Sequence, residues 1–208
     1  EALYREAIAS YRKELGQPPL PGVAIGLIEA LNGLAELLRR ESRVQAAANS
    51  LREAVSLIES MGTSDLPTDR VPEVKTQVYH NLATIVSFSP QFRDAEALYR
   101  KALGEQISDK DMAPSLLKSK GAAWGDFAVY LDFHGKAQEA EQARQKAFAI
   151  RQQLVNDFPR VPGYRRDLAI IHENLGWAAT KRTEHDAAIT SMQAAIEISR
   201  PPEDIWPW

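Results

Sequence analysis

The 208-residue sequence contains no cysteine, which excludes disulfide bonds, thiol catalysis and zinc sites built on thiolates. It also lacks an excess of basic residues. The formal net charge of −3 argues against a nucleic-acid partner or contact with a membrane surface. No apolar stretch approaches the ~18 residues of a membrane span, and the alternation typical of β-strands is nearly absent. With 44% apolar and 25% charged residues, the composition is that of a folded chain, either ordinary domains or one elongated array.

Sequence motifs of common catalytic and cofactor sites are missing as well. There is no GxxxxGK[ST] or GxGxxG phosphate-binding motif and no GxSxG nucleophile elbow. His172-Glu173 resembles the start of a zinc-protease HExxH helix, but Gly176 stands where the second histidine is required. We therefore expect no enzymatic activity, no metal and no cofactor. Metal-ligand spacing is also absent from the four histidines, which are His80, His134, His172 and His185.

An internal repeat is the main feature that the sequence does contain. Four anchor pairs mark comparable units, with their first members 48, 45 and 48 residues apart: Leu34-Ala35, Leu82-Ala83, Phe127-Ala128 and Leu175-Gly176. Each anchor is followed by an alanine 13 residues later and by another 20 residues later. These eight alanines are Ala47, Ala95, Ala140, Ala188, Ala54, Ala102, Ala147 and Ala195, and Ala7 extends the series backward. Alanines seven apart share one helix face, where small side chains allow neighbouring helices to approach closely.

The segments around these anchors have the apolar period of helices. Leu27, Leu31, Leu34 and Leu38 form one such stripe, and proline-containing breakers separate the units. The sequence predicts an array over 1–199, in which 1–16 is a half repeat and 22–61, 72–107, 114–157 and 161–199 are full repeats. The predicted helix pairs are 22–41/43–61, 72–88/92–107, 114–134/136–157 and 161–182/184–199.

These motifs resemble the tetratricopeptide (TPR) repeat family. Trp124-x2-Phe127-Ala128-x2-Leu131 matches the family's first helix, and Ala95-x3-Tyr99-x2-Ala102 matches its second. The period of 45–48 residues exceeds the family's usual 34 and is similar to that of kinesin-light-chain-type and planctomycete-type bacterial repeats. The resemblance implies an all-α fold, a right-handed α-solenoid of antiparallel helix pairs.

The resemblance also implies a function. Proteins of this family are typically non-catalytic scaffolds, so we expect this chain to bind a peptide or partner protein in its concave groove. The alternative is a regulatory or oligomerisation segment of a larger signalling protein, whose kinase or protease domain is absent from this chain. Ala7 aligns with the last alanine of a unit, so we expect further sequence before Glu1. The expected location is cytoplasmic.

In that family the first helix of each unit lines the groove. Carried over by register, the candidate binding residues are Asn32, Glu36, Arg39, Gln77, His80, Asn81, Thr84, Asp126, Glu173, Asn174, Trp177 and Thr180, with Glu29, Ser87, Gly125, Val129 and Asp132 at related positions. The alternative for each is ordinary polar surface or, for Trp177 and His80, packing between units. By the same register, Leu175 and Gly176 are expected to point into the packing.

Asn81 and Asn174 occupy the same position in different units. An asparagine amide both donates and accepts, so it can pair with the backbone of an extended peptide. The acidic residues of the first helices predict a preference for neutral or basic peptides, and the basic pattern of the family's chaperone-tail clamp is missing. The tail, 200–208, contains Ile205, Trp206 and Trp208. We expect it to cap the last helix, to dock into a neighbouring molecule as a route to self-association, or to be disordered.

Overall fold

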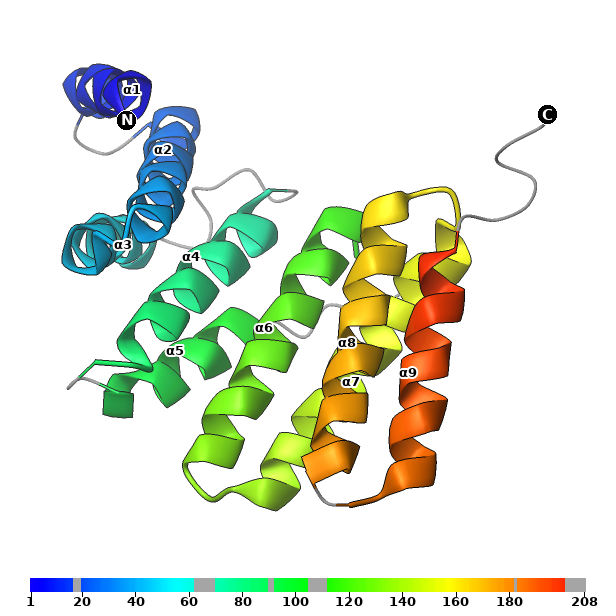
Figure 1. The fold of residues 1–208 in the computed structure, drawn as a ribbon. Helices are drawn as coiled ribbons and strands as arrows, with labels where there is room; N and C mark the ends of the chain where they lie inside the picture. Colours follow the sequence, from blue (N-terminus) through cyan, green and yellow to red (C-terminus); the bar gives the residue numbers. More distant parts are fainter. Residues whose placement is uncertain (17–19, 62–69, 90–91, 105–111, 182, 201–208) are drawn as a thin grey trace.

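The computed structural model describes residues 1–16, 20–61, 70–89, 92–104, 112–181 and 183–200. In these ranges the chain forms nine α-helices and no strand (Figure 1). The helices are α1 (Ala2–Glu14), α2 (Pro21–Arg40), α3 (Val44–Ser60), α4 (Val71–Val86), α5 (Phe92–Leu103), α6 (Pro114–Phe133), α7 (Ala137–Asp157), α8 (Pro162–Lys181) and α9 (His185–Ser199).

Consecutive helices pack as pairs, and the pairs stack in chain order. α2 packs with α3, α4 with α5, α6 with α7, and α8 with α9. Neighbouring units meet where α4 packs against α2 and α6, and where α7 packs against α8. Figure 1 shows α1 and α9 at opposite ends of this array. The predicted all-α solenoid of helix pairs is thereby confirmed. α5 ends at Leu103 rather than at 107, because Gly104 follows it and glycine commonly terminates a helix.

The repeated alanines lie where the helices approach most closely. All eight are buried, and Ala47, Ala95 and Ala140 have no exposed surface. A larger side chain at these positions displaces a neighbouring helix, so the repeat register follows from close packing. At the start of the array, glycines of α2 allow the tyrosines of α1 to approach closely in the same way. A Cβ on Gly26 would lie 2.6 Å from the ring of Tyr11, and one on Gly33 would lie 2.6 Å from the ring of Tyr4.

The turn inside a unit repeats in its backbone geometry. Ser42, Gly135 and Thr183 each stand eight residues after their anchor and have φ of 61°, 75° and 61°. In each turn the next residue's N–H bonds to a carbonyl five residues earlier, as in Arg43 N to Leu38 O at 2.8 Å. This is the Schellman arrangement, which satisfies carbonyls at the end of a helix. The equivalent residue of the second unit, Pro90, lies outside the described residues.

The prediction that no apolar stretch approaches the length of a membrane span did not account for α2. By length and composition alone α2 qualifies as a membrane span, since an 18-residue window has a mean hydropathy of 1.4. Half of that window is buried inside the array, and α2 packs against α1, α3 and α4. Burial on several sides accounts for the apolar content of this helix, because a core helix carries apolar residues around much of its circumference.

Candidate functional site

A pocket of about 130 Å³ lies between the carboxyl-terminal ends of α4 and α6. We call it the α4–α6 pocket. Units two and three both contribute to it, which requires the two first helices to lie side by side, as Figure 1 shows. Its lining residues are Thr84, Ser87, Phe88, Tyr99, Asp126, Val129, Tyr130, Phe133 and His134.

Exposed apolar side chains surround the entrance of this pocket. Phe88 is 86% exposed, Phe133 is 85% exposed and Val129 is 62% exposed. Single exposed apolar residues are common on protein surfaces, but a group of them around one concavity indicates a binding site. Phe88 and Phe133 each stand six residues after their anchors, Leu82 and Phe127, so the repeat itself brings the two phenylalanines to equivalent places.

Buried aromatic rings form the floor. Tyr99 is only 2% exposed, and its ring stacks on Phe127 with centroids 5.2 Å apart. The Tyr99 hydroxyl lies 3.4 Å from Oγ1 of Thr84. Burial raises the pKa of Tyr99, so the phenol stays protonated and keeps a hydrogen bond donor at the base of the pocket.

His80 and Asp126 join the two helices at the edge of the pocket. His80 Nε2 lies 2.8 Å from Asp126 Oδ2, and Thr84 Oγ1 donates to the same carboxylate oxygen at 3.4 Å. Both groups therefore orient the Asp126 carboxylate. The single Thr84 hydroxyl proton is shared between this carboxylate and the His80 carbonyl oxygen, which lies 3.0 Å from Oγ1 and fixes the Thr84 rotamer.

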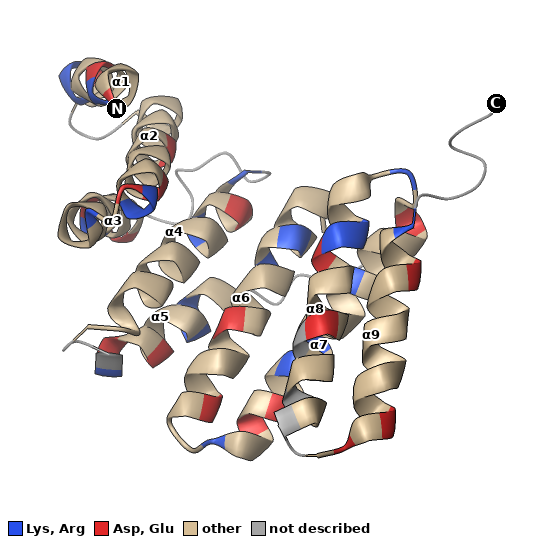
Figure 2. Ribbon diagram, in the orientation of Figure 1, with Lys and Arg blue, Asp and Glu red and all other residues tan. Residues whose placement is uncertain are grey.

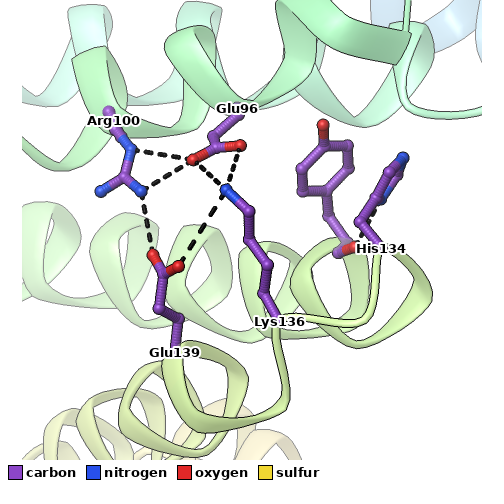
Figure 3. A network of polar contacts seen from close by, with 6 residues as sticks. Glu96, Arg100, His134, Lys136 and Glu139 are labelled. Carbon is purple, nitrogen blue, oxygen red and sulfur yellow. Dashed lines mark hydrogen bonds and ion pairs between the residues drawn. The ribbon is translucent and has the colours of Figure 1, made fainter.

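A network of charges lies near His134, one of the residues that line the pocket (Figure 3). Lys136 Nζ lies 2.8 Å from both carboxylate oxygens of Glu96, and Arg100 lies 2.8 Å from Glu96 and 3.0 Å from Glu139. Lys136, followed by Arg100, holds the pKa of Glu96 below its ordinary value. The network ties α5 to the start of α7. His134, in the intervening turn, lines the pocket and has its Nδ1 2.8 Å from the Tyr130 carbonyl oxygen.

The asparagines of the groove have a different arrangement from the one expected from sequence. Nδ2 of Asn81 donates to Oδ1 of Asn32 at 2.8 Å, so these two predicted binding residues pair with each other across α2 and α4. Gln77 donates to Glu73 at 3.0 Å and to Ser119 at 3.3 Å. The Asn81–Asn32 and Gln77–Ser119 contacts join adjacent units, and they occupy hydrogen-bonding groups that we had assigned to a peptide backbone.

The acidic residues on the first helices are mostly paired with cations. Ion pairs join Glu29 to Arg70, Glu36 to Arg40, and Asp132 to Arg144. Glu173 has no such pair among the described residues. Pairing reduces the net field of these carboxylates at the surface of the first helices. Figure 2 shows cationic and acidic residues interspersed along the helices.

No described residue of the fourth unit lines the α4–α6 pocket. Trp177 is 63% exposed on α8, and the Thr180 hydroxyl donates to the Gly176 carbonyl at 2.9 Å. The side chain of Asn174 lies outside the described residues. Of the residues predicted by register, the pocket brings together Thr84, Ser87, Asp126 and Val129, with His80 beside them. Asn32, Glu36 and Arg39 lie on α2, away from it.

The expectation that Leu175 points into the packing was wrong, because its side chain is 37% exposed. Its equivalents in the earlier units, Leu34, Leu82 and Phe127, are at most 5% exposed. No described unit follows α9 to cover Leu175. Gly176 does face the packing. A Cβ there would lie 2.9 Å from Met192.

Two kinds of residue escaped the sequence reasoning. Phe88 and Phe133 share a register position that we did not include, although comparison of units at equal offsets reveals it. Arg151 belongs to the second helix α7, yet its guanidinium lies against Gly125 of α6, where a Cβ would be 3.4 Å from Nη1. Burial lowers the pKa of Arg151, while Asp167 and Asp126 act to raise it. No pattern in the sequence indicated that a second-helix side chain crosses at a glycine.

The described residues contain no group of three or more His, Asp or Glu side chains positioned to hold a metal ion. The α4–α6 pocket combines an aromatic floor, an apolar entrance and hydroxyl and carboxylate groups at its edge. A pocket of this kind binds a large apolar side chain while its polar edge fixes orientation.

Comparison with known proteins gives the fold. No family model matches the chain, and no curated protein matches it. Among solved structures, the chain is similar to the crystal structure of BtubC (BKLC) from P. vanneervenii. The TM-score is 0.65 at 22% identity, and the match covers 94% of this chain and 72% of that chain. The chain therefore has the fold of a TPR-like helical repeat protein.

Proposed function

We propose that this chain is a non-catalytic scaffold of the TPR type, with a long repeat of the kinesin-light-chain kind, and that it binds a segment of a partner protein. The observation that carries the proposal is the α4–α6 pocket, with Phe88, Val129 and Phe133 exposed around an aromatic floor. Leaving three such side chains in water is unfavourable by roughly 25 cal/mol per Å² of apolar area. Covering them with a partner recovers that free energy.

The pocket's size suits one side chain. A cavity of about 150 Å³ lined by apolar groups accepts a benzene ring in a well-studied protein, and the α4–α6 pocket measures about 130 Å³. We expect the partner segment to place a leucine- or phenylalanine-sized residue there. The Tyr99 hydroxyl, Thr84 and Asp126 then contact polar groups of the partner's backbone.

Protein rather than nucleic acid is the proposed partner. The net charge is −3, and acidic and basic residues alternate over the helices instead of forming a basic stripe (Figure 2). The fold of a helical-repeat protein supports a scaffold without catalysis, because such arrays present extended surfaces to partners.

Selection of a random peptide library on the whole 208-residue chain tests the proposal. Selected peptides are expected to share a large apolar residue and to bind the Phe88→Ala/Phe133→Ala double variant at least about tenfold more weakly, since aromatic anchors commonly exceed 1.4 kcal/mol each. Leu3→Ala is the matched control, because Leu3 is 82% exposed on α1, remote from the pocket. Equal binding by both variants contradicts the proposed site.

A further inference from the structure

Arg151 of α7 is a half-buried cation whose guanidinium has no partner. It forms no hydrogen bond or ion pair in the part of the chain that the structure describes. Every buried side-chain nitrogen or oxygen in that part has a hydrogen-bond partner, so the Arg151 nitrogens reach the surface. Arg144, on the same helix, pairs instead with Asp132 and Glu141. The N–H donors of Arg151 are therefore available to a ligand.

Two glycines of α6 make room for this side chain. Gly121 and Gly125 are four residues apart and share one face of the helix. A Cβ on Gly121 would lie 3.7 Å from Cγ of Arg151, and one on Gly125 would lie 3.4 Å from its Nη1. The stem thus follows Gly121 and the guanidinium reaches Gly125. α6 approaches α8 less closely than it approaches α4, which leaves space for a side chain of the second helix.

The guanidinium lies across α6 from the α4–α6 pocket. Gly125 directly precedes Asp126, which lines the pocket and faces His80 of α4. Figure 1 shows α6 between α4 and α8. Packed helix axes are about 8–10 Å apart, so the pocket and Arg151 are separated by about one helix width. Extended chain advances about 3.3 Å per residue, and a segment anchored in the pocket reaches Arg151 about three residues further on.

The surrounding charges indicate the kind of ligand. Asp167 and Asp126 act on Arg151 electrostatically, and neither pairs with it within the described ranges. One positive charge near two negative charges gives no net positive site, so an anionic ligand is not favoured. Burial lowers the pKa of Arg151, which reflects the cost of holding this charge partly out of water. A neutral acceptor offsets that cost without adding negative charge, and the carbonyl groups of a peptide backbone are such acceptors.

We propose that Arg151 donates to a main-chain carbonyl of the partner segment, about three residues from the apolar side chain that enters the α4–α6 pocket. The inference rests on the proposed function and deepens it, since it names how the segment's backbone is held. Sequence register assigned this role to asparagines of the first helices, but Asn81 is paired with Asn32. Because every residue has a main-chain carbonyl, the contact tolerates any side chain at that position of the partner.

Replacement of Arg151 by methionine tests the proposal, because methionine keeps an unbranched stem over Gly121 and lacks the guanidinium. The probe is the tightest peptide from the random library selected on the whole chain. A second version has each Asp and Glu replaced by Asn and Gln and an amidated carboxyl terminus. Arg151→Met is expected to bind both versions about tenfold more weakly, as loss of a hydrogen bond to a charged group implies. Arg160→Met is the matched control, because Arg160 is exposed in the turn between α7 and α8, and it should bind like the parent.

Arg151→Lys is the second variant, since it keeps the stem and the charge. It is also expected to bind more weakly, because an ammonium group lacks the planar fork of donors. Thermal melting checks that each variant is folded. Parent-like affinity of the folded Arg151 variants overturns the inference. A loss confined to the acidic version of the peptide overturns it too, because the guanidinium then binds a carboxylate.

The Phe88→Ala/Phe133→Ala variant, titrated with the same peptides, separates this inference from the proposed function. Weak binding by that variant, together with parent-like binding by the Arg151 variants, overturns the role of Arg151 alone. Parent-like binding by the phenylalanine variant contradicts the α4–α6 pocket itself. A library that yields no binder contradicts both.

Discussion

Nε2 of His80 lies 2.8 Å from Oδ2 of Asp126, and 46 residues separate the two side chains in sequence. That separation is close to one repeat period. The same is true of Asn32 and Asn81, 49 residues apart. The first and second units, and the second and third, are thus joined by paired polar side chains on their first helices. Stacking of the repeat brings distant residues into contact.

The His80–Asp126 contact is expected to orient the pocket more than it stabilises the fold. The Asp126 side chain is 51% exposed, and polar contacts to exposed carboxylates typically contribute about 0–1 kcal/mol. Asp126→Ala should therefore lower the free energy of unfolding by less than about 1 kcal/mol in urea titration. The variant should nevertheless weaken binding of peptides selected on the parent chain. Unchanged peptide affinity argues against a role for this carboxylate in recognition.

Replacement of Thr183 by glycine is expected to stabilise the chain. A β-branched residue at φ of 61° is strained, and release of that strain is worth about 1 kcal/mol. Gly135 occupies the equivalent turn at φ of 75°, so Gly135→Thr should have the opposite effect. Thermal unfolding of both variants measures the two changes. A lower Tm for Thr183→Gly contradicts the turn geometry.

Enlargement of a repeat alanine should disrupt packing between helices. Ala95 is fully buried, so Ala95→Trp is expected to cost about 1–3 kcal/mol or more and to lower Tm. Ala149 is exposed on α7, and Ala149→Trp provides the control with the same change of side chain. If the two variants have the same Tm, the alanine at this repeat position is not required for close packing of the helices.

Stability should fall as the pH drops below about 6.5, in part because of His172. Burial lowers the pKa of His172 from 6.5, so the unfolded chain takes up this proton more readily than the folded chain. The contribution of the neutral ring is complete above the unfolded pKa and is lost as the pH falls through the folded pKa. His172→Phe keeps a ring against Phe148, whose centroid is 5.4 Å away. Urea titrations between about pH 7.5 and 5.5, a range that spans the ordinary pKa of histidine, should show a smaller loss of stability for this variant. An identical loss in both proteins rules out His172 as a source.

The array was predictable because its physical cause is local and periodic. Eight alanines at two offsets mark the helix contacts, and all eight are buried. An apolar stripe at helical spacing requires no knowledge of distant residues, since one helix displays it by itself. Part of the pocket was predictable by the same register, because Thr84 and Asp126 lie on the first helices.

The sequence by itself determined the repeat, its helices and the small residues where they meet, because these depend on spacing along one chain segment. Only the tertiary structure decided which side chains meet across units. The pairing of Asn81 with Asn32, the crossing of Arg151 at Gly125 and the exposure of Phe88 and Phe133 around one pocket all depend on how successive helix pairs are stacked. A periodic pattern fixes which face of a helix is apolar, whereas contacts between units also depend on helix separation and angle.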